Sequence, residues 1–450
     1  MLANLAVSVG FEVPRHIRGI GLSELTLSRR NPLGWGRLVL VAIGIAGLPI
    51  PAHAQRPDTL RLADAVATAR AANPMVQAAR LGADAAAERV PQAGAWSDPQ
   101  LAFGLVNRML PGFGTDDPMT MNEFRLTQML PWPGKLGFGQ ERAEHLARAG
   151  AFEAVDAEVR LVSRVKSVYA ELAYIDRAIA IMDRTRGLLR DFFQVSQAMY
   201  AVGEGLQQDV LQAQVAVARM TEDIVVMQQE RLAMAARLNA LMGRGASEPI
   251  GALELADAGA ALPGVDSLMA RAAAGRPALQ AAYERVRAAE AGYRAARREL
   301  YPDFMVQLAY GQRPQFDDMA TVMVGISIPL WAGARQLPMR REMAAMQAGE
   351  DAMARDLYNE TFAELTERRA EAERARSLAE LYQSSILPQA RAAVEAALSA
   401  YRVGRVNYMT LVESEMTVNR YEVELVRLAA AYHQAAAEIE ALVGGEGGTR

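Results

Sequence analysis

The chain has 450 residues, of which 51% are hydrophobic and 22% are charged, and its formal net charge is −4. This near balance argues against a nucleic-acid partner, because a phosphate-binding surface needs clustered lysine and arginine. Cysteine is absent and histidine occurs only four times. Disulfides, thiolate metal sites and a cysteine nucleophile are therefore excluded, and the sequence predicts no cofactor, no metal site and no enzyme.

Residues 1–54 are predicted to be a signal peptide. Arginines up to Arg37 precede the apolar run 38–48, and the small residues Ala52 and Ala54 give the small-x-small pattern of a cleavage site. The run is too short, and too promptly followed by that site, for a spanning helix. We expect the mature chain to begin at Gln55.

The rest of the sequence is an ordered duplication. Residues 200–203 (Tyr-Ala-Val-Gly) return as residues 401–404 (Tyr-Arg-Val-Gly), and residues 73–79 correspond to residues 276–282. A period of about 200 residues is far longer than a solenoid unit, so each copy is a half-domain. The predicted organisation is a first repeat at 55–243, a connector at 244–264, a second repeat at 265–444 and a disordered tail at 445–450.

Each repeat is expected to begin with helices and continue into a β-hairpin. Residues 60–89 are alanine-rich, with a break at Asn73-Pro74. Apolar residues then alternate with small or polar ones, which is typical of strands. The alternating positions are Leu101, Phe103, Leu105, Phe124 and Leu126 in the first repeat, and Phe304, Val306, Leu308, Tyr310, Val322, Val324, Ile326 and Ile328 in the second. The chain therefore has four predicted strands.

A corner of proline and glycine follows each hairpin: Pro131, Pro133 and Gly134 in the first repeat, Pro329 and Gly333 in the second. Proline lacks a ladder donor and glycine accepts unusual backbone angles, so these residues should end a strand and redirect the chain.

Very long helices are predicted beyond the corners. Residues 134–200 begin with Gly134 and contain no proline. Their apolar positions recur at close to the 3.5-residue coiled-coil period. The matching helix at 339–401 contains Pro388, which should kink it.

The alternating strands fit two structures on pattern alone: a soluble hairpin packed on helices, or a membrane β-barrel. A lipid-facing sheet cannot keep open edges, and the smallest such barrels have eight strands. One chain with four strands could not close a barrel, so several chains would have to pool their strands.

Taken together, four features resemble the outer-membrane efflux (TolC-like) family over essentially the whole mature length. They are the duplicated unit, the corner at 128–135, the run from 386 into 401–404, and the ending at 432–444. The resemblance implies a mainly α chain whose two hairpins join those of two other chains in a homotrimeric 12-stranded barrel. The barrel would lie in outer-membrane lipid, with a coiled-coil helical barrel in the periplasm.

The resemblance also implies partners and sites. A periplasmic membrane-fusion adaptor, fed by an inner-membrane pump of the resistance-nodulation-division type, would dock on the turns at Val202, Gly203, Val403 and Gly404. The alternative is plain helix punctuation, since glycine commonly ends helices.

A channel constriction is implied at Asp209 and Glu413, where acidic rings would favour cations. Thr410 replaces the companion acid of the family pattern. The alternative is that both carboxylates are solvated residues near helix N-termini, where negative charge is mildly favourable.

The sequence is therefore interpreted as a passive exit duct without catalysis, with metal cations as one candidate substrate. Its 22 methionines could bind soft metal or simply supply flexible packing, which is favoured. His145 and His433 are expected to be structural or surface residues. The rival interpretations are an exported coiled-coil structural protein, or a drug-efflux or type I secretion duct of the same family.

Overall fold

The computed structural model describes residues 59–445. The predicted signal peptide, its cleavage site and the tail residues 446–450 lie outside the described residues. The elements run α1 (Leu62–Ala72), α2 (Pro74–Gly94), β1 (Gln100–Val106), β2 (Met121–Leu130), α3 (Lys135–Ala201), α4 (Gln207–Leu241), α5 (Val265–Gly275), α6 (Pro277–Arg298), β3 (Asp303–Gln312), β4 (Met319–Ser327), α7 (Gln336–Leu381), a π-helix (Tyr382–Ile386), α8 (Leu387–Arg402) and α9 (Tyr408–Leu442).

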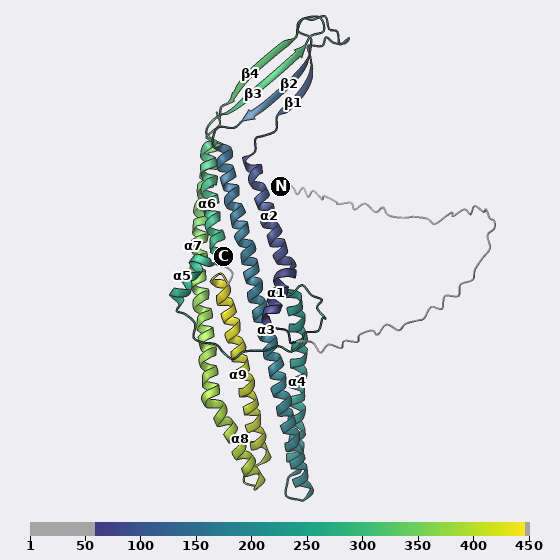
Figure 1. The fold of residues 1–450 in the computed structure, drawn as a ribbon, viewed down its shortest axis with the longest axis vertical. Coiled ribbons are helices and arrows are strands. Elements are labelled where there is room, and N and C mark those ends of the chain that lie inside the picture. The colour runs from purple at the N-terminus through teal and green to yellow at the C-terminus, as the bar shows by residue number, and fades with distance from the viewer. Residues whose placement is uncertain (1–58, 446–450) are drawn as a thin grey trace, which may run out of the picture. The chain divides into compact units, whose positions relative to one another are not determined.

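The duplication is visible in this order of elements (Figure 1). Each repeat supplies two helices, one β-hairpin and a pair of long helices that meet at a turn. The predicted fold class, a mainly α chain that carries two β-hairpins, is confirmed. Residues 244–264, between the repeats, form neither helix nor strand.

The break between α1 and α2 follows from a proline and an N-cap. The side-chain oxygen of Asn73 accepts hydrogen bonds from the backbone N–H groups of Met75 (2.9 Å) and Val76 (3.3 Å). Pro74 occupies the first turn of α2, where its missing N–H leaves no bond unmade. Pro277 opens α6 in the second repeat in the same way.

Helix α3 is the spine of the chain. It runs for 67 residues without interruption, which corresponds to roughly 100 Å at 1.5 Å per residue. Its first half packs against α2 and α6, and its second half against α4 and α9. The sheet therefore lies at one end of this spine and the helix–helix turns at the other (Figure 1).

The four strands form one antiparallel sheet in the order β1-β2-β3-β4. The two hairpins meet through β2 and β3, with Phe124 opposite Tyr310 and Met129 opposite Met305. Directly opposed residues point to the same face. The predicted alternation is therefore realised across both repeats, and one face of the sheet is formed by the leucine, phenylalanine and valine positions.

Buried clusters hold the helices together at two levels. One joins α1, α3, α4 and the connector around Leu172, Leu238 and Ile250. A second, nearer the turns, joins α3, α4, α8 and α9 around Leu189 and Tyr408. The second cluster ties the two helical hairpins of the chain to each other.

The helix of the second repeat is interrupted next to Pro388, where the sequence predicts a kink. Residues Tyr382–Ile386 form a π-helix between α7 and α8, and Pro388 lies in the first turn of α8. Proline has no N–H to donate to the carbonyl of Ser384, so the regular bonding pattern fails there. In the π-helix the N–H of Leu387 instead donates to the carbonyl of Tyr382, five residues earlier.

Within residues 59–445, no helix combines the length and apolar character needed to cross a membrane.

Candidate functional site

The first helical turn lies between α3 and α4. Gly203 adopts a left-handed conformation with φ 79°, and the N–H groups of Glu204 and Gly205 both donate to the carbonyl of Met199, at 2.9 and 3.0 Å. This arrangement satisfies the carbonyls at the end of α3, as glycine C-caps generally do. The predicted turn at Val202 and Gly203 therefore lies at the far tip of the first hairpin.

The second turn repeats this geometry between α8 and α9. Gly404 has φ 70°, and the N–H of Arg405 donates to the carbonyl of Ala400 (2.9 Å). The side chain of Asn407 then caps α9, accepting from the N–H of Thr410 at 3.0 Å and from its hydroxyl at 2.8 Å. Thr410, which replaces an expected acid, is thus part of a helix cap.

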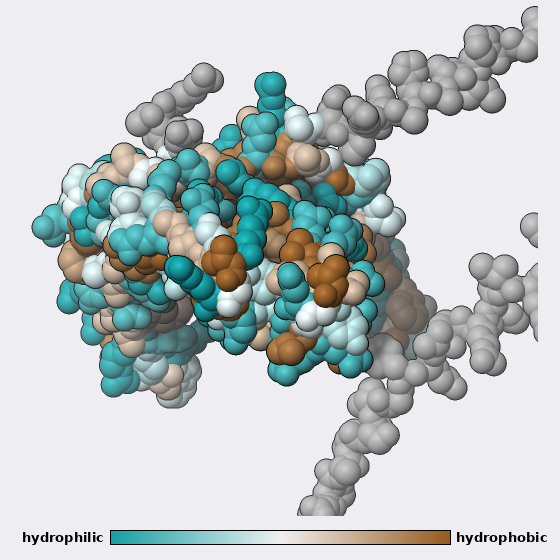
Figure 2. Space-filling model, turned by 90° about the horizontal axis from the view of Figure 1, so that it is seen from below, coloured by the Kyte–Doolittle hydropathy of each residue, from teal (hydrophilic) through white to brown (hydrophobic). Residues whose placement is uncertain are grey.

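Both tips expose apolar side chains. Val202 is 72% exposed and Val403 is 67% exposed, and Leu206 between α3 and α4 is also exposed. Seen end-on, this part of the molecule shows separate hydrophobic patches surrounded by polar residues (Figure 2). Single exposed apolar side chains are common on protein surfaces, so docking at these tips stays a prediction.

The two candidate constriction acids have different environments. Glu413 is exposed on α9 and lines a groove of about 1040 Å³ between α9 and α4, together with Gln208, Arg219 and Arg420. Asp209 is half-buried in the first turn of α4. Its charge, added to the larger effect of burial, raises the pKa of the hydroxyls of Tyr401 and Tyr408. The structure therefore places Asp209 beside a buried tyrosine pair, and Glu413 on an open groove.

The tyrosine pair was not identified from sequence. Tyr401 and Tyr408 face each other across the second tip, with ring centroids 5.9 Å apart in an edge-to-face arrangement. Tyr408 is completely buried, and its hydroxyl has no hydrogen-bond partner among the described residues. Tyr408 begins the buried stripe of α9, which continues with Leu411. A side chain with a polar group at a position of this otherwise apolar stripe is the sequence signal that could have revealed the site.

Glu415 occupies the same buried stripe of α9 and was also missed. Only 6% of this residue is exposed. Burial is the main cause that raises the pKa of its carboxyl, and the negative charge of Glu422 adds to it, against the opposing effect of Arg184. Glu422 itself pairs with Arg184 of α3 and, at 2.6 Å, with Arg391 of α8. The pair with Arg184 connects the two helical hairpins, and the pair with Arg391 joins α8 to α9 within the second one.

The first barrel-to-helix corner is fixed by contacts between the repeats. Its residues Pro131 and Pro133 flank Trp132. The backbone N–H of Trp132 donates to the carboxylate of Asp303 (2.8 Å). Gly134 takes a left-handed φ of 91°, and Lys135 then pairs with the same Asp303 at 2.9 Å.

The second corner is a series of short turns. The N–H of Leu330 donates to the carbonyl of Ile328 (2.8 Å), and that of Ala332 to Pro329 (3.2 Å). Gly333 has open space around it and precedes the start of α7. Both predicted corners therefore redirect a strand into a long helix, by different hydrogen bonds.

The two helical histidines make contacts within the chain. His145 Nδ1 lies 2.7 Å from the buried carboxylate of Glu284, which also accepts from Arg148 at 2.9 Å. His433 Nε2 lies 3.1 Å from the carbonyls of both Ala256 and Asp257. These contacts assign the two rings to packing between helices and to holding the connector.

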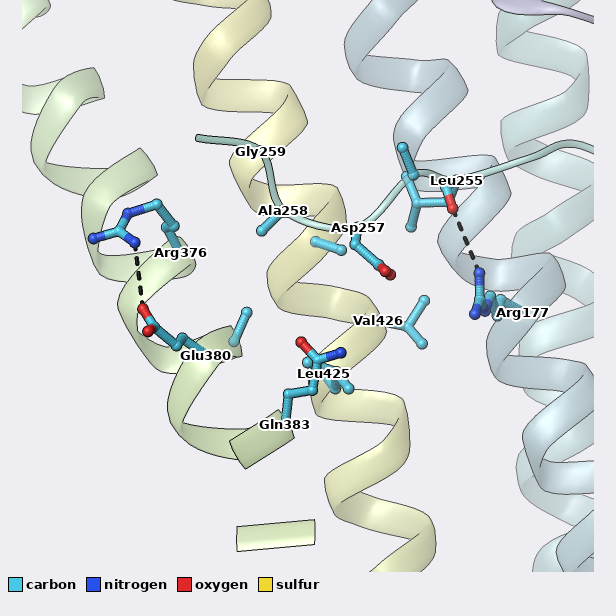
Figure 3. A pocket seen from close by; sticks show the side chains of 13 residues that line it. Arg177, Leu255, Asp257, Ala258, Gly259, Arg376, Glu380, Gln383, Leu425 and Val426 are labelled. Carbon is cyan, nitrogen blue, oxygen red and sulfur yellow. Dashed lines mark hydrogen bonds and ion pairs between the residues drawn. The ribbon is translucent and has the colours of Figure 1, made fainter. Parts of the chain in front are cut away.

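A cavity of about 320 Å³ lies where the connector crosses α7 and α9 (Figure 3). Arg177 borders it on one side and donates to the carbonyl of Leu255 (3.4 Å). On the other side Arg376 pairs with Glu380 (3.3 Å), and Gln383 of the π-helix completes the lining. The interruption of the second long helix therefore borders this cavity through Gln383, while Tyr382 of the same π-helix packs edge-on against Tyr421 of α9.

A model of the family described as outer membrane efflux protein matches residues 65–244 and 268–445. No curated protein sequence matches the chain.

Several solved structures share the fold. The structure of CusC aligns with a TM-score of 0.75 at 16% identity, over 87% of this chain and 93% of CusC. VceC from Vibrio cholerae aligns at 0.73 and 18%, over 85% and 96%. CmeC from Campylobacter jejuni aligns at 0.73 and 12%, over 85% of each chain.

Proposed function

The chain belongs to the outer membrane efflux protein family, and from this premise we propose that it is the exit duct of a tripartite efflux system. Its place is the outer membrane, with the helices in the periplasm. In this proposal three copies close a barrel of twelve strands, an inner-membrane pump of the resistance-nodulation-division type supplies the substrate, and a periplasmic adaptor joins pump and duct. The duct performs no catalysis.

The observation that carries the proposal is the separation of two kinds of exposed apolar surface. The sheet presents Leu101, Phe103 and Val322 on one face, which suits lipid. The opposite end of the spine presents Val202 and Val403 on glycine turns. A structural coiled coil would require neither surface. CmeC and MtrE, which share the fold, are described as outer membrane channels.

A first test addresses the proposed docking of the adaptor on the tips. A Cβ built on Gly203 or Gly404 meets open space, so the strain of a side chain at their left-handed φ stays local to the turn, and Gly203→Phe and Gly404→Phe should leave the trimer assembled while obstructing the tip surface. We expect crosslinking to the adaptor to fall while heat-modifiable trimers remain on a gel. Gly112→Phe, in an open turn of the β1–β2 loop, is the control. Normal crosslinking of both tip variants would refute docking there.

A second test addresses the proposed constriction at Glu413. Three copies of Glu413 around a threefold axis would form a negative throat that selects cations and is blocked by multivalent ones. Glu413→Ala should therefore change conductance and weaken block by multivalent cations in planar bilayers, whereas Glu395→Ala, an exposed acid on α8, should not. Unaltered currents and block would remove Glu413 from the constriction. Asp209→Asn tests the second ring in the same assay.

Metal cations are one candidate substrate within this proposal. The observation in favour of them is that the methionines of the strands share one face of the sheet.

A further inference from the structure

The strand register divides the sheet into two chemically different faces. The apolar face consists of Leu101, Phe103, Leu105, Asn122, Phe124, Leu126, Gln128, Leu130, Phe304, Val306, Leu308, Tyr310, Gln312, Ala320, Val322, Val324 and Ile326. The polar face consists of Gln100, Ala102, Gly104, Val106, Met121, Glu123, Arg125, Thr127, Met129, Asp303, Met305, Gln307, Ala309, Gly311, Met319, Thr321, Met323, Gly325 and Ser327.

Methionine is confined to the polar face. All five methionines of the strands lie there and none lies on the apolar face. Apart from them, the polar face carries no apolar side chain larger than that of Val106. If the chain needed only bulk at these positions, the leucine, isoleucine and phenylalanine of the apolar face would serve equally well. The pattern therefore singles out what methionine alone offers among these residues, a flexible side chain that carries a thioether.

Three of the five methionines form a contiguous group across β2, β3 and β4. Met129 is directly opposite Met305, a relation that puts Cβ atoms about 5 Å apart. Met305 is opposite Gly325, and its side chain lies over that glycine, since a Cβ built there would be 3.0 Å from Met305 Cε. Met323 is the neighbour of Gly325 on the same face. Three flexible thioethers can therefore converge over the space that Gly325 leaves.

The other two methionines flank a second glycine nearer the loops. Met319 is opposite Gly311, and Met121 Sδ lies 2.5 Å from where a Cβ of Gly311 would be. Each methionine group is thus built around a glycine that gives it room.

The carboxylates of this face are already paired. Glu123 lies 2.5 Å from Arg125, and Asp303 lies 2.9 Å from Lys135. The described residues contain no group of three or more histidine, cysteine, aspartate or glutamate side chains that could hold a metal ion. A hard divalent cation would therefore find no unpaired carboxylate on this face, whereas thioethers prefer soft monovalent ions.

We propose that Met129, Met305 and Met323 form a binding site for a soft monovalent cation, Cu(I) or Ag(I), on the lumen wall of the duct. The inference rests on the proposed function, because the polar face lines a lumen only when three copies close the barrel. The site would then occur three times in each trimer, close to the junction with the helices. Met121 and Met319 form a two-thioether step farther along the same wall.

The rival occupant is an apolar organic solute, because methionine-rich surfaces also adapt to varied apolar ligands. The structure favours the cation, since aromatic side chains, which usually line sites for organic ligands, are confined to the apolar face of the strands. Leucine separates the two possibilities: it keeps the apolar volume of methionine and removes the sulfur.

The test is Ag(I) binding to the purified detergent-solubilised trimer, measured by calorimetry in chloride-free silver nitrate, with single-channel conductance recorded for the same preparations. The triple variant Met129→Leu, Met305→Leu, Met323→Leu is compared with the control Met346→Leu, Met353→Leu, whose methionines are exposed on α7. We expect about three Ag(I) per wild-type trimer at this site, unchanged binding by the control, and binding weakened by more than about tenfold in the triple variant.

Equal Ag(I) binding by the triple variant and the wild type would overturn the proposal. If that result is accompanied by equal binding of an apolar fluorescent solute, such as a naphthylamine, to both proteins, the group is assigned to the apolar occupant. If the wild-type trimer conducts normally but binds no Ag(I), the cation site is wrong and the exit duct stands. If it forms no conducting trimer, the duct is wrong and the lumen site is rejected with it.

Discussion

Removing one oxygen atom, in Tyr408→Phe, should make the helical tips more stable. Tyr408 is completely buried between the two hairpins, and its hydroxyl has no partner among the described residues. A buried polar group without a hydrogen bond costs about 1–3 kcal/mol in desolvation. Phenylalanine keeps the ring, and with it the edge-to-face contact with Tyr401, while it removes that cost.

The expected gain can be converted into a shift of the melting temperature. An unfolding entropy of about 2.1 cal/mol/K per residue gives roughly 0.8 kcal/mol/K for a folded unit of about 390 residues. A gain of about 1–3 kcal/mol then corresponds to a rise of about 1–4 °C. Scanning calorimetry of the purified trimer, at matched detergent and protein concentration, can resolve such a rise.

Tyr432→Phe is the matched control with the opposite sign. The hydroxyl of Tyr432 donates to the carbonyl of Ala260 at 2.7 Å, and a hydrogen bond of this kind contributes about 0.5–1.5 kcal/mol. This variant should therefore melt at a lower temperature than the wild type. If Tyr408→Phe also lowers the melting temperature, its hydroxyl has a partner, either a water or a neighbouring subunit, and the reasoning from an unsatisfied group is refuted.

Two further predictions concern the connector and the buried acid. Gly259→Ala places a Cβ 2.8 Å from the hydroxyl of Tyr432 and should destabilise the fold by about 1–3 kcal/mol, whereas Gly264→Ala meets open space; equal melting temperatures would contradict this contact. Burial, reinforced by the negative charge of Glu422, raises the pKa of the Glu415 carboxyl. The folded state therefore holds this proton more tightly than the unfolded state does. The free energy of unfolding should then fall as pH rises from the ordinary glutamate range through the raised pKa. Glu415→Gln should raise the melting temperature at neutral pH and flatten its dependence above pH 4.5, and a profile parallel to that of the wild type would exclude this role.

Sequence patterns alone predicted the positions of those helices and strands whose signals lie within the element or at its ends. Helix α3 begins at Lys135 and ends at Ala201, within one residue of the predicted 134–200, because the Pro-Gly corner and the tip glycine punctuate it at both ends. The strands follow the predicted alternation, apart from Ile328, which lies just past the end of β4. Left-handed glycines occupy both predicted turns, although docking at those turns remains a proposal.

Contacts between the repeats could not be predicted from local patterns. Asp303 pairs with Lys135 and caps Trp132 across about 170 positions of sequence, and nothing near either residue indicates the other. The ion pair of Glu422 with Arg184 likewise depends on how two separately predicted hairpins pack. The grouping of the methionines required the pairing of β2 with β3, because it is the register between the repeats that brings Met129 opposite Met305.

The two repeats differ in how firmly their long helices are held, and this difference bears on how the duct could open. Helix α3 is continuous and is braced along its length by contacts such as Arg231 with Asp176 (2.5 Å). The corresponding helix of the second repeat is broken by a π-helix beside a cavity, 16 residues before its tip. A change in tip position needs a place where backbone hydrogen bonds can rearrange at low cost, and the second repeat has one at Tyr382–Ile386. If the proposed constriction widens by a movement within the second repeat, α8 should pivot at Tyr382–Ile386 while α3 stays in place.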